Sequence, residues 1–158
     1  MYDDRSTPSS RRCAMILFGG TYHHTIDAKG RVNIPAPMRK QLTGDSAEHV
    51  WVTRGLQDGC VFVYPHGNWE LKMQELAALP RTEQNAVNIR MFSMGSFRAE
   101  LDAQGRIVVP PQYQKEAGFA GDVVIVGVMD RIEIWNPAAH QRYQAANEQS
   151  FQQLVRTF

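Results

Sequence analysis

Residues 21–42, TYHHTIDAKGRVNIPAPMRKQL, and residues 96–117, SFRAELDAQGRIVVPPQYQKEA, are two copies of one sequence. A constant shift of 75 residues relates the copies without a gap, and six of the 22 aligned pairs are identical. A repeated segment indicates two copies of one supersecondary unit that bury each other's apolar faces. Either half alone would leave such a face exposed, so we predict one unit whose copies interlock about a pseudo-two-fold axis.

The longest run shared by the copies, Asp-Ala-x-Gly-Arg, is polar and typical of a turn. Aspartate at its first position accepts hydrogen bonds from backbone N–H groups, and glycine at its fourth position tolerates a positive φ. A type I turn followed by a left-handed glycine is a common hairpin loop. We therefore expect turn-forming roles for Asp27, Gly30, Asp102 and Gly105. A repeated polar turn also indicates a surface for a partner, which a repeated apolar core would not.

Both halves predict the same order of elements around these turns. The first half has strands at 21–26, 31–34, 50–54 and 61–64, the last two around a turn at 57–59, with helices at 36–42 and from 69 to about 78. The second half has strands at 96–101, 106–109, 123–128 and 132–135, with helices at 110–117 and from 137 onward, and a further helix follows Thr82. We expect Asn68, Thr82 and Asn136 to cap helices, with Pro137 in the first helical position.

The predicted fold class is α+β, a β-rich double swapped-hairpin barrel with peripheral helices that include a C-terminal one. We expect a first repeat at 15–80, a connecting helix at 81–95 and a second repeat at 96–158 with the C-terminal helix. The polar residues 1–14 are expected to be a disordered tail, or an upstream start ahead of a natural start at Met15.

Composition excludes several classes of protein. The chain of 158 residues has a net charge of +1, and its longest apolar run, at 123–129, is too short to cross a membrane. Cys13 and Cys60 have no Cys-x-x-Cys partner, which argues against a zinc site or a disulfide framework. Adjacent His23 and His24 would point to opposite faces of a strand, so they do not predict a metal site. We expect a cytoplasmic protein without a cofactor.

The motifs of an enzyme are also missing from the sequence. The repeated Asp-x-x-x-Arg offers an acid and a cation but no nucleophile. The chain has no phosphate-binding loop, serine-centred elbow or dinucleotide fingerprint. We therefore expect neither catalysis nor a small-molecule substrate.

Positive charge is concentrated in the first copy. Residues 21–43 contain four cations against one carboxylate, whereas residues 96–118 contain three cations against three carboxylates. Contact with phosphate needs cations, so we expect the first copy to carry the main contact with any anionic partner.

In these motifs and in the order of its elements, the chain resembles the MraZ family of transcriptional regulators, which are built from two AbrB-like swapped-hairpin units. The resemblance covers about residues 15–158. It rests on the opening MILFGGTY at 15–22, the paired Asp-x-x-x-Arg motifs at Asp27/Arg31 and Asp102/Arg106, the Pro35/Arg39 spacing and the strand end Ile132–Trp135. The two motifs in register, with glycine before arginine and proline after it, are specific where one motif alone is weak.

The resemblance implies binding to double-stranded promoter DNA at short direct repeats, usually ahead of the division and cell-wall gene cluster. It also implies a repressor, a ring-shaped homo-oligomer and a nucleoid-associated location. The candidate DNA-binding residues are Lys29 and Arg31 at the first loop, Arg39 and Lys40 on the short helix within about one turn of that loop, and Arg106 at the second loop.

Among these candidates Arg31 is expected to dominate. Arginine reaches guanine edges or phosphate while an aspartate braces it, and Lys29 adds a cation at the loop tip. The second copy has Gln104 where the first has Lys29, and Gln114 where the first has Arg39. Arg106 is therefore expected to act mainly by pairing with Asp102. Two alternatives to a regulator remain, an antitoxin-like DNA-binding protein of the same fold and a ring-forming assembly module that does not bind DNA.

Overall fold

The computed structural model describes residues 15–43, 49–55 and 59–158. The first repeat contributes β1 (Thr21–Thr25), β2 (Arg31–Asn33), α1 (Ala36–Thr43), β3 (His49–Arg54), β4 (Cys60–Pro65) and α2 (His66–Ala77). Helix α3 (Glu83–Met94) connects the repeats. The second repeat contributes β5 (Ser96–Glu100), β6 (Arg106–Val108), α4 (Pro111–Ala117), β7 (Asp122–Val128), β8 (Arg131–Trp135) and α5 (Pro137–Val155). The α+β class and the predicted order of elements are therefore confirmed.

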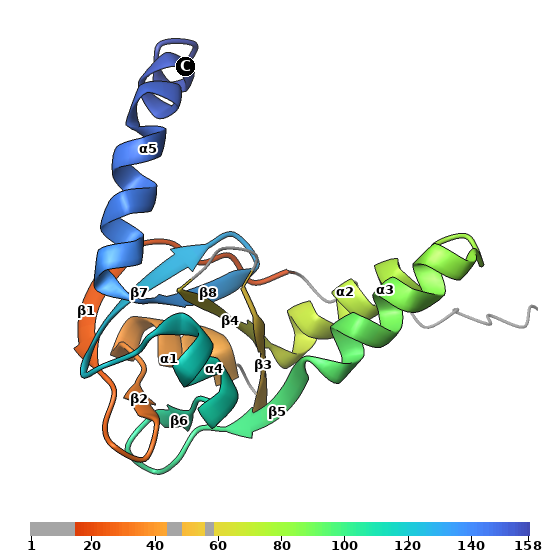
Figure 1. Cartoon of the computed structure of the whole chain (residues 1–158), viewed down its shortest axis with the longest axis horizontal. Coiled ribbons are helices and arrows are strands. Elements are labelled where there is room, and N and C mark those ends of the chain that lie inside the picture. The colour runs from red at the N-terminus through yellow and green to blue at the C-terminus, as the bar shows by residue number, and fades with distance from the viewer. Residues whose placement is uncertain (1–14, 44–48, 56–58) are drawn as a thin grey trace, which may run out of the picture.

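The strands form a six-stranded antiparallel sheet with the order β1-β7-β8-β4-β3-β5 (Figure 1). The sheet is symmetric with respect to the two copies. Exchanging each strand for its counterpart (β1 for β5, β3 for β7, β4 for β8) gives the same order read from the opposite edge. Strand β1 pairs with β7 of the other copy, and β5 likewise pairs with β3. The predicted interlocking of the copies is thus present in the strand pairing. The described strands do not join into one closed barrel.

A separate ribbon of two short strands, β2 and β6, also joins the copies. Its pairs are Arg31 with Val108, Val32 with Ile107 and Asn33 with Arg106. The shift of 75 residues exchanges the outer pairs and leaves the central pair in place, so a pseudo-two-fold axis passes through Val32 and Ile107. Strands β1 and β2, although adjacent in the chain, belong to different sheets, and an isolated bridge between Ile26 and Val32 lies where the chain passes from one to the other.

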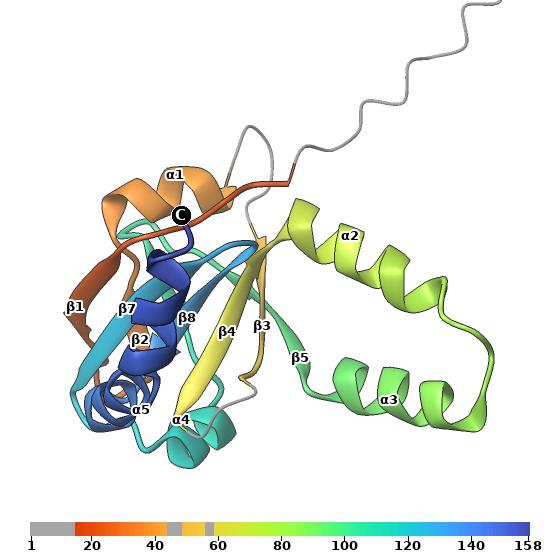
Figure 2. The same cartoon turned by 90° about the horizontal axis from the view of Figure 1, so that it is seen from above.

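One apolar core fills the space between the strands and two short helices. Val32 and Ile107 of the ribbon, Met38 of α1 and Tyr113 of α4 are all almost fully buried in it. Figure 2 shows α1 and α4 at opposite ends of the strands, where each closes one end of the core. The proline of each copy that ends the ribbon strand, Pro35 or Pro110, directly precedes one of these helices.

Two of the three predicted helix caps are confirmed. The Thr82 hydroxyl accepts from Asn85 N at 3.1 Å, and the Asn136 amide oxygen accepts from Ala138 N at 2.9 Å, with Pro137 in the first turn. The Asn68 cap is wrong, because α2 begins at His66, directly after β4. Asn68 is buried instead and bonds to Ile16 N, Ile16 O and Asp130 O, so its amide holds the N-terminal segment against the turn between β7 and β8.

Two helical arms extend from this body. The α2–α3 hairpin projects from the edge of the sheet, and α5 leaves the body in another direction (Figures 1 and 2). No side chain of α3 is buried, and Ala139 is the one buried residue of α5. The described helices include none that is long and apolar enough to cross a membrane. The predicted tail at 1–14, with Cys13, and turn residues 57 and 58 lie outside the described residues.

Candidate nucleic-acid interface

The first loop, Asp27–Arg31, is folded around its aspartate. Asp27 Oδ1 accepts from Lys29 N and Arg31 N, both at 2.9 Å, and Asp27 Oδ2 pairs with Arg31 Nε at 2.6 Å. Gly30 N donates to Asp27 O at 3.0 Å, and Asp27 N donates to Arg31 O at 3.0 Å. One carboxylate therefore fixes both the backbone of the turn and the direction of the arginine side chain.

The second loop, Asp102–Arg106, repeats these contacts atom for atom. Asp102 Oδ1 accepts from Gln104 N and Arg106 N, both at 2.9 Å, and Asp102 Oδ2 pairs with Arg106 Nε at 2.8 Å. Hydrogen bonds from backbone N–H groups, with the one from the arginine largest, lower the pKa of Asp27 and of Asp102. The expected turn-forming role of both aspartates thus has a direct structural basis.

Glycine is required in each loop because the backbone is left-handed there. Gly30 has φ 78° and Gly105 has φ 75°, values that side-chain-bearing residues rarely adopt. A Cβ at Gly30 would collide with the side chain of Gln114, and one at Gly105 would collide with the side chain of Arg39. The glycines therefore also allow a helix of the other copy to approach each loop.

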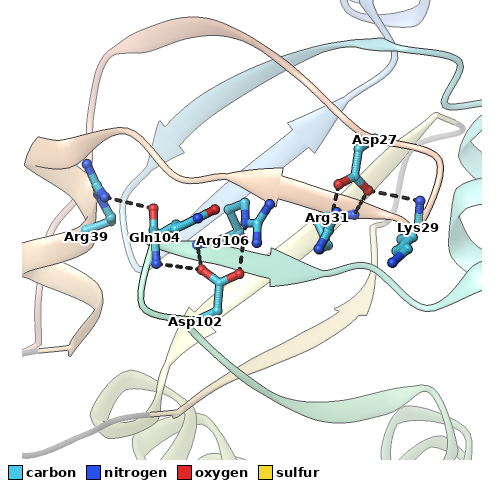
Figure 3. A network of polar contacts seen from close by, with 7 residues as sticks. All are labelled: Asp27, Lys29, Arg31, Arg39, Asp102, Gln104 and Arg106. Carbon is cyan, nitrogen blue, oxygen red and sulfur yellow. Dashed lines mark hydrogen bonds and ion pairs between the residues drawn. The ribbon is translucent and has the colours of Figure 1, made fainter.

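The two loops lie at opposite ends of the β2–β6 ribbon (Figure 3). Backbone bonds tie each loop to the other copy, since Ile34 N donates to Gly105 O at 3.0 Å and Val109 N donates to Gly30 O at 2.9 Å. With about 3.4 Å of rise per residue, the first and last of the three pairs lie roughly 7 Å apart along the ribbon.

The position of Arg39 corrects the prediction from sequence, which placed this residue beside the first loop. Arg39 lies against the second loop instead, where its Nη1 donates to Gln104 O at 3.2 Å (Figure 3). Its counterpart Gln114, on α4, lies against the first loop and donates to Val109 O at 2.7 Å. The cause is the exchange of strand partners, which brings α1 to the loop of the other copy.

This exchange removes the charge asymmetry seen along the sequence. The first loop gathers Lys29 and Arg31 against Asp27, and the second gathers Arg39 and Arg106 against Asp102. Each loop therefore carries a net charge of +1. Lys40 is exposed in the last turn of α1.

Side chains along the ribbon alternate between the core and the surface. Val32 and Ile107 face the core, whereas Arg31, Asn33, Arg106 and Val108 face outward. Asn33 is exposed beside Arg106, its partner in the register, and Val108 is 51% exposed beside Arg31. Analysis of the sequence missed Asn33 and Val108, although strict alternation in the strand 31–34 would have placed both on the outer face.

Nothing in the described part of the chain gathers three or more metal-ligating side chains. His23 and His24 differ in exposure, as expected for neighbours on a strand. The outer face of the ribbon instead offers guanidinium groups, an amide and a small apolar side chain, flanked by two more cations. This set of groups can bind phosphate and base edges.

Comparison with known proteins places the chain among relatives of nearly the same length. A protein from Natranaerobius thermophilus is 40% identical over 140 residues, which cover 88% of this chain and 94% of the relative. One from Lactobacillus delbrueckii subsp. bulgaricus has the same identity and coverage, and one from Lachnoclostridium phytofermentans is 42% identical over 120 residues, or 76% of this chain and 82% of the relative. Each is named transcriptional regulator MraZ, the name of a regulator and not of an enzyme, in agreement with the prediction from sequence.

The family model described as "MraZ protein, putative antitoxin-like" matches the chain twice, over residues 17–92 and 91–158. Each match contains one copy of the internal repeat. Together they span nearly all of the described chain, and the resemblance noted from the sequence is confirmed. The chain belongs to the MraZ family.

Proposed function

We propose that this chain is a transcriptional regulator that binds double-stranded promoter DNA through the outer face of the β2–β6 ribbon and its two loops. The observation that carries the proposal is the pair of identically folded loops, each with a braced arginine and a second cation, at the two ends of one ribbon. The names of the relatives support the assignment to transcription.

The ribbon is an element of a kind that the DNA major groove can accommodate. The groove is about 12 Å wide and admits a two-stranded β-ribbon. Arg31 and Arg106 face outward, and the bond of each Nε to an aspartate fixes the guanidinium while leaving other N–H groups free for guanine or phosphate. Asn33 is suited to adenine and Val108 to a thymine methyl group. Lys29, Arg39 and Lys40 would then contact phosphates on either side.

We further propose that the chain acts as a ring-shaped homo-oligomer. The arms expose large apolar side chains that a monomer would leave in water. On α5 and the C-terminal end these are Tyr143, Phe151, Leu154, Val155 and Phe158, and on the α2–α3 hairpin they are Leu79, Val87, Met91 and Met94. Unpartnered apolar patches of this kind are typical of protein interfaces.

Assembly would also raise the affinity for DNA. One protomer presents two loops with a small net charge, so its own affinity would be modest. Several copies acting on repeated sites gain affinity through effective concentration. Neighbours related by rotation in a ring would suit direct repeats of the DNA site.

The remaining parts of the proposal rest on the resemblance to the family. They are repression at short direct repeats upstream of the division and cell-wall gene cluster, and a cytoplasmic, nucleoid-associated location. The architecture would be the AbrB-like swapped hairpin. In the first copy, β1 and β2 both pair with strands of the second copy, β7 and β6. In the second copy, β5 and β6 likewise pair with β3 and β2 of the first. This pairing across the copies supports the architecture.

A mobility-shift assay with the DNA upstream of the gene tests the proposal, run at two salt concentrations beside light scattering. Specific retention that falls steeply with salt is expected, because bound cations release counterions from phosphates. An intact oligomer that does not retain this DNA at low salt would contradict the proposal and favour an assembly module. Neutralisation of a toxin encoded beside the gene would favour the antitoxin alternative.

A further inference from the structure

The α2–α3 hairpin is attached to the sheet by a small cluster of rings at its base. Trp51 of β3 stacks on Trp69 of α2, with ring centroids 5.1 Å apart and planes 10° from parallel. Trp69 stacks in turn on Phe92 of α3, at 5.3 Å and 15°. Farther out, the hairpin lies away from the body (Figure 2). The stack of three rings is therefore a principal attachment of the arm to the sheet.

Two histidines close one side of this stack. His49 Nε2 lies 2.9 Å from His66 Nδ1, and the Trp51 indole Nε1 donates to the same His66 Nδ1 at 3.3 Å. His66 Nε2 lies 2.8 Å from Glu70 Oε1, which fixes the far side of the ring. The pair thus links β3 to the first turn of α2, directly beside the stacked tryptophans.

The positions of the protons follow from what each group can do. An indole N–H only donates, so His66 Nδ1 must be unprotonated and its proton lies on Nε2, toward Glu70. His49 Nε2 must then donate to His66 Nδ1. When both imidazoles are neutral, the His49 and Trp51 N–H groups share the one lone pair of His66 Nδ1, with His49 the nearer donor. A proton on His66 Nδ1 would deprive Trp51 of its acceptor, and charging both rings would leave two N–H groups facing each other.

We propose that the His49–His66 pair is a pH-sensitive latch that holds the α2–α3 hairpin on the sheet when both rings are neutral and loosens it when they are protonated. Neither the internal repeat nor the proposed binding to DNA requires this pair. In the second copy the strand register places Asp122 where the first copy has His49, because Thr25, the counterpart of Glu100, lies opposite Asp122.

Charged groups on several elements surround the two histidines. Cationic side chains oppose protonation of the imidazoles, and carboxylates favour it. On β5, Arg98 and Glu100 lie opposite Trp51 and His49 in the register, while α2 contributes Glu70 and Lys72. Tyr64 of β4 lies opposite Trp51, with Lys72 over its ring. Burial is the largest cause that lowers the pKa of His49, followed by Arg98 and His66, against the acidic residues.

The lowered pKa gives the sign of the effect. The closed latch favours neutral His49, so the open state binds more protons as pH falls below the ordinary histidine value of about 6.5. Closure is complete above that pH and is lost below it. Each linked proton can change the opening equilibrium by up to about tenfold per pH unit.

The test compares the full-length wild type with His49→Gln, His66→Gln and a control, His140→Gln, between pH 8 and 5. His140 is a matched control because the pKa of its side chain is also lowered, mainly by burial, while it lies on α5 against Trp135. The readouts are amide exchange in α2–α3, corrected for intrinsic rates, and the near-ultraviolet circular dichroism of the stacked tryptophans. Both are recorded at fixed protein concentration.

In the wild type and His140→Gln, we expect exchange in the hairpin to rise and the tryptophan signal to fall below pH 6.5. The two latch variants should lose most of this pH dependence. His49→Gln keeps the bond from Trp51 to His66, so it remains informative if His66→Gln packs poorly. Wild-type exchange that does not change with pH, or an unchanged profile in His49→Gln, would overturn the proposal.

Discussion

The two loops, Asp27–Arg31 and Asp102–Arg106, have the same internal hydrogen bonds but different neighbouring side chains. In both, one carboxylate accepts two backbone N–H groups at 2.9 Å and pairs with the arginine Nε. The surroundings differ, since the first loop has Lys29 at its tip and Gln114 beside it, whereas the second has Gln104 at its tip and Arg39 beside it. Each loop thus gains its second cation by a different route.

The comparison shows that a repeated motif does not determine its own environment. The hydrogen bonds made by each aspartate all lie within its own five-residue loop. The second cation of loop two, by contrast, comes from a residue 65 positions away in the chain. Because the loops have the same internal bonds but different neighbours, mutations can separate the contribution of each loop and of each second cation to DNA binding.

The largest expected effect, loss of the folded state, follows from separating the two copies of the repeat. A chain shortened to residues 15–80 would lack β5, β6, β7 and β8, and with them the partners of β1, β2 and one edge each of β3 and β4. We expect no cooperative thermal transition, because the core is built from both copies. The measurement is thermal unfolding by circular dichroism beside residues 15–158. A folded, monomeric 15–80 would show that the copies are independent.

Removing the arginines should affect promoter binding most. Loss of a base-edge arginine costs roughly 1–3 kcal/mol per site, and repetition around a ring should make Arg31→Ala binding undetectable. Arg106→Ala should retain weak binding, because the exposed Lys29 of the intact first loop is a freer cation than Arg39, which is tied to Gln104 O. Promoter affinity is measured by titration.

Melting temperatures provide the control for this comparison. Both variants lose the same bond to aspartate, so their melting temperatures should fall by similar amounts. If a folded Arg31→Ala binds like the wild type and a folded Arg106→Ala does not, then the second loop dominates the contact with DNA.

A smaller effect is expected from Asp27→Asn and Asp102→Asn. Hydrogen bonds lower the pKa of both carboxylates in the folded chain, so each stabilises the fold above the unfolded pKa of about 3.9 and less as pH falls through that value. Each variant should therefore melt below the wild type at pH 7, with a difference that narrows toward pH 2. Unequal losses in the two variants would show that the loops are not energetically equivalent.

The smallest effect concerns the second cation of each loop. Lys29→Gln and Arg39→Gln each remove one positive charge, and Gln114 shows that glutamine is tolerated on the short helix against a loop. Each variant should reduce the salt slope of DNA binding by about 0.9 if its cation contacts one phosphate. The measurement is affinity at several salt concentrations. A change in Lys29→Gln alone would assign phosphate contact to the first loop only.

The sequence by itself determined the parts of the molecule that depend on neighbours in the chain. The Asp-Ala-x-Gly-Arg turn, the left-handed Gly30 and Gly105, the order of elements, and the caps Thr82 and Asn136 were all predicted. Each rests on hydrogen bonds or backbone preferences within a few residues, which are encoded wherever the motif occurs.

Only the tertiary structure decided which copy each element joins. The same apolar strands could bury their faces within one copy or across two, and the alternation of residues does not distinguish these pairings. The exchange moved Arg39 from the first loop to the second and cancelled the charge difference counted along the chain. It also grouped Asn33 with Arg106. The role of Asn68 was also decided by tertiary structure, because α2 begins before it and its buried amide bonds to Ile16 and Asp130.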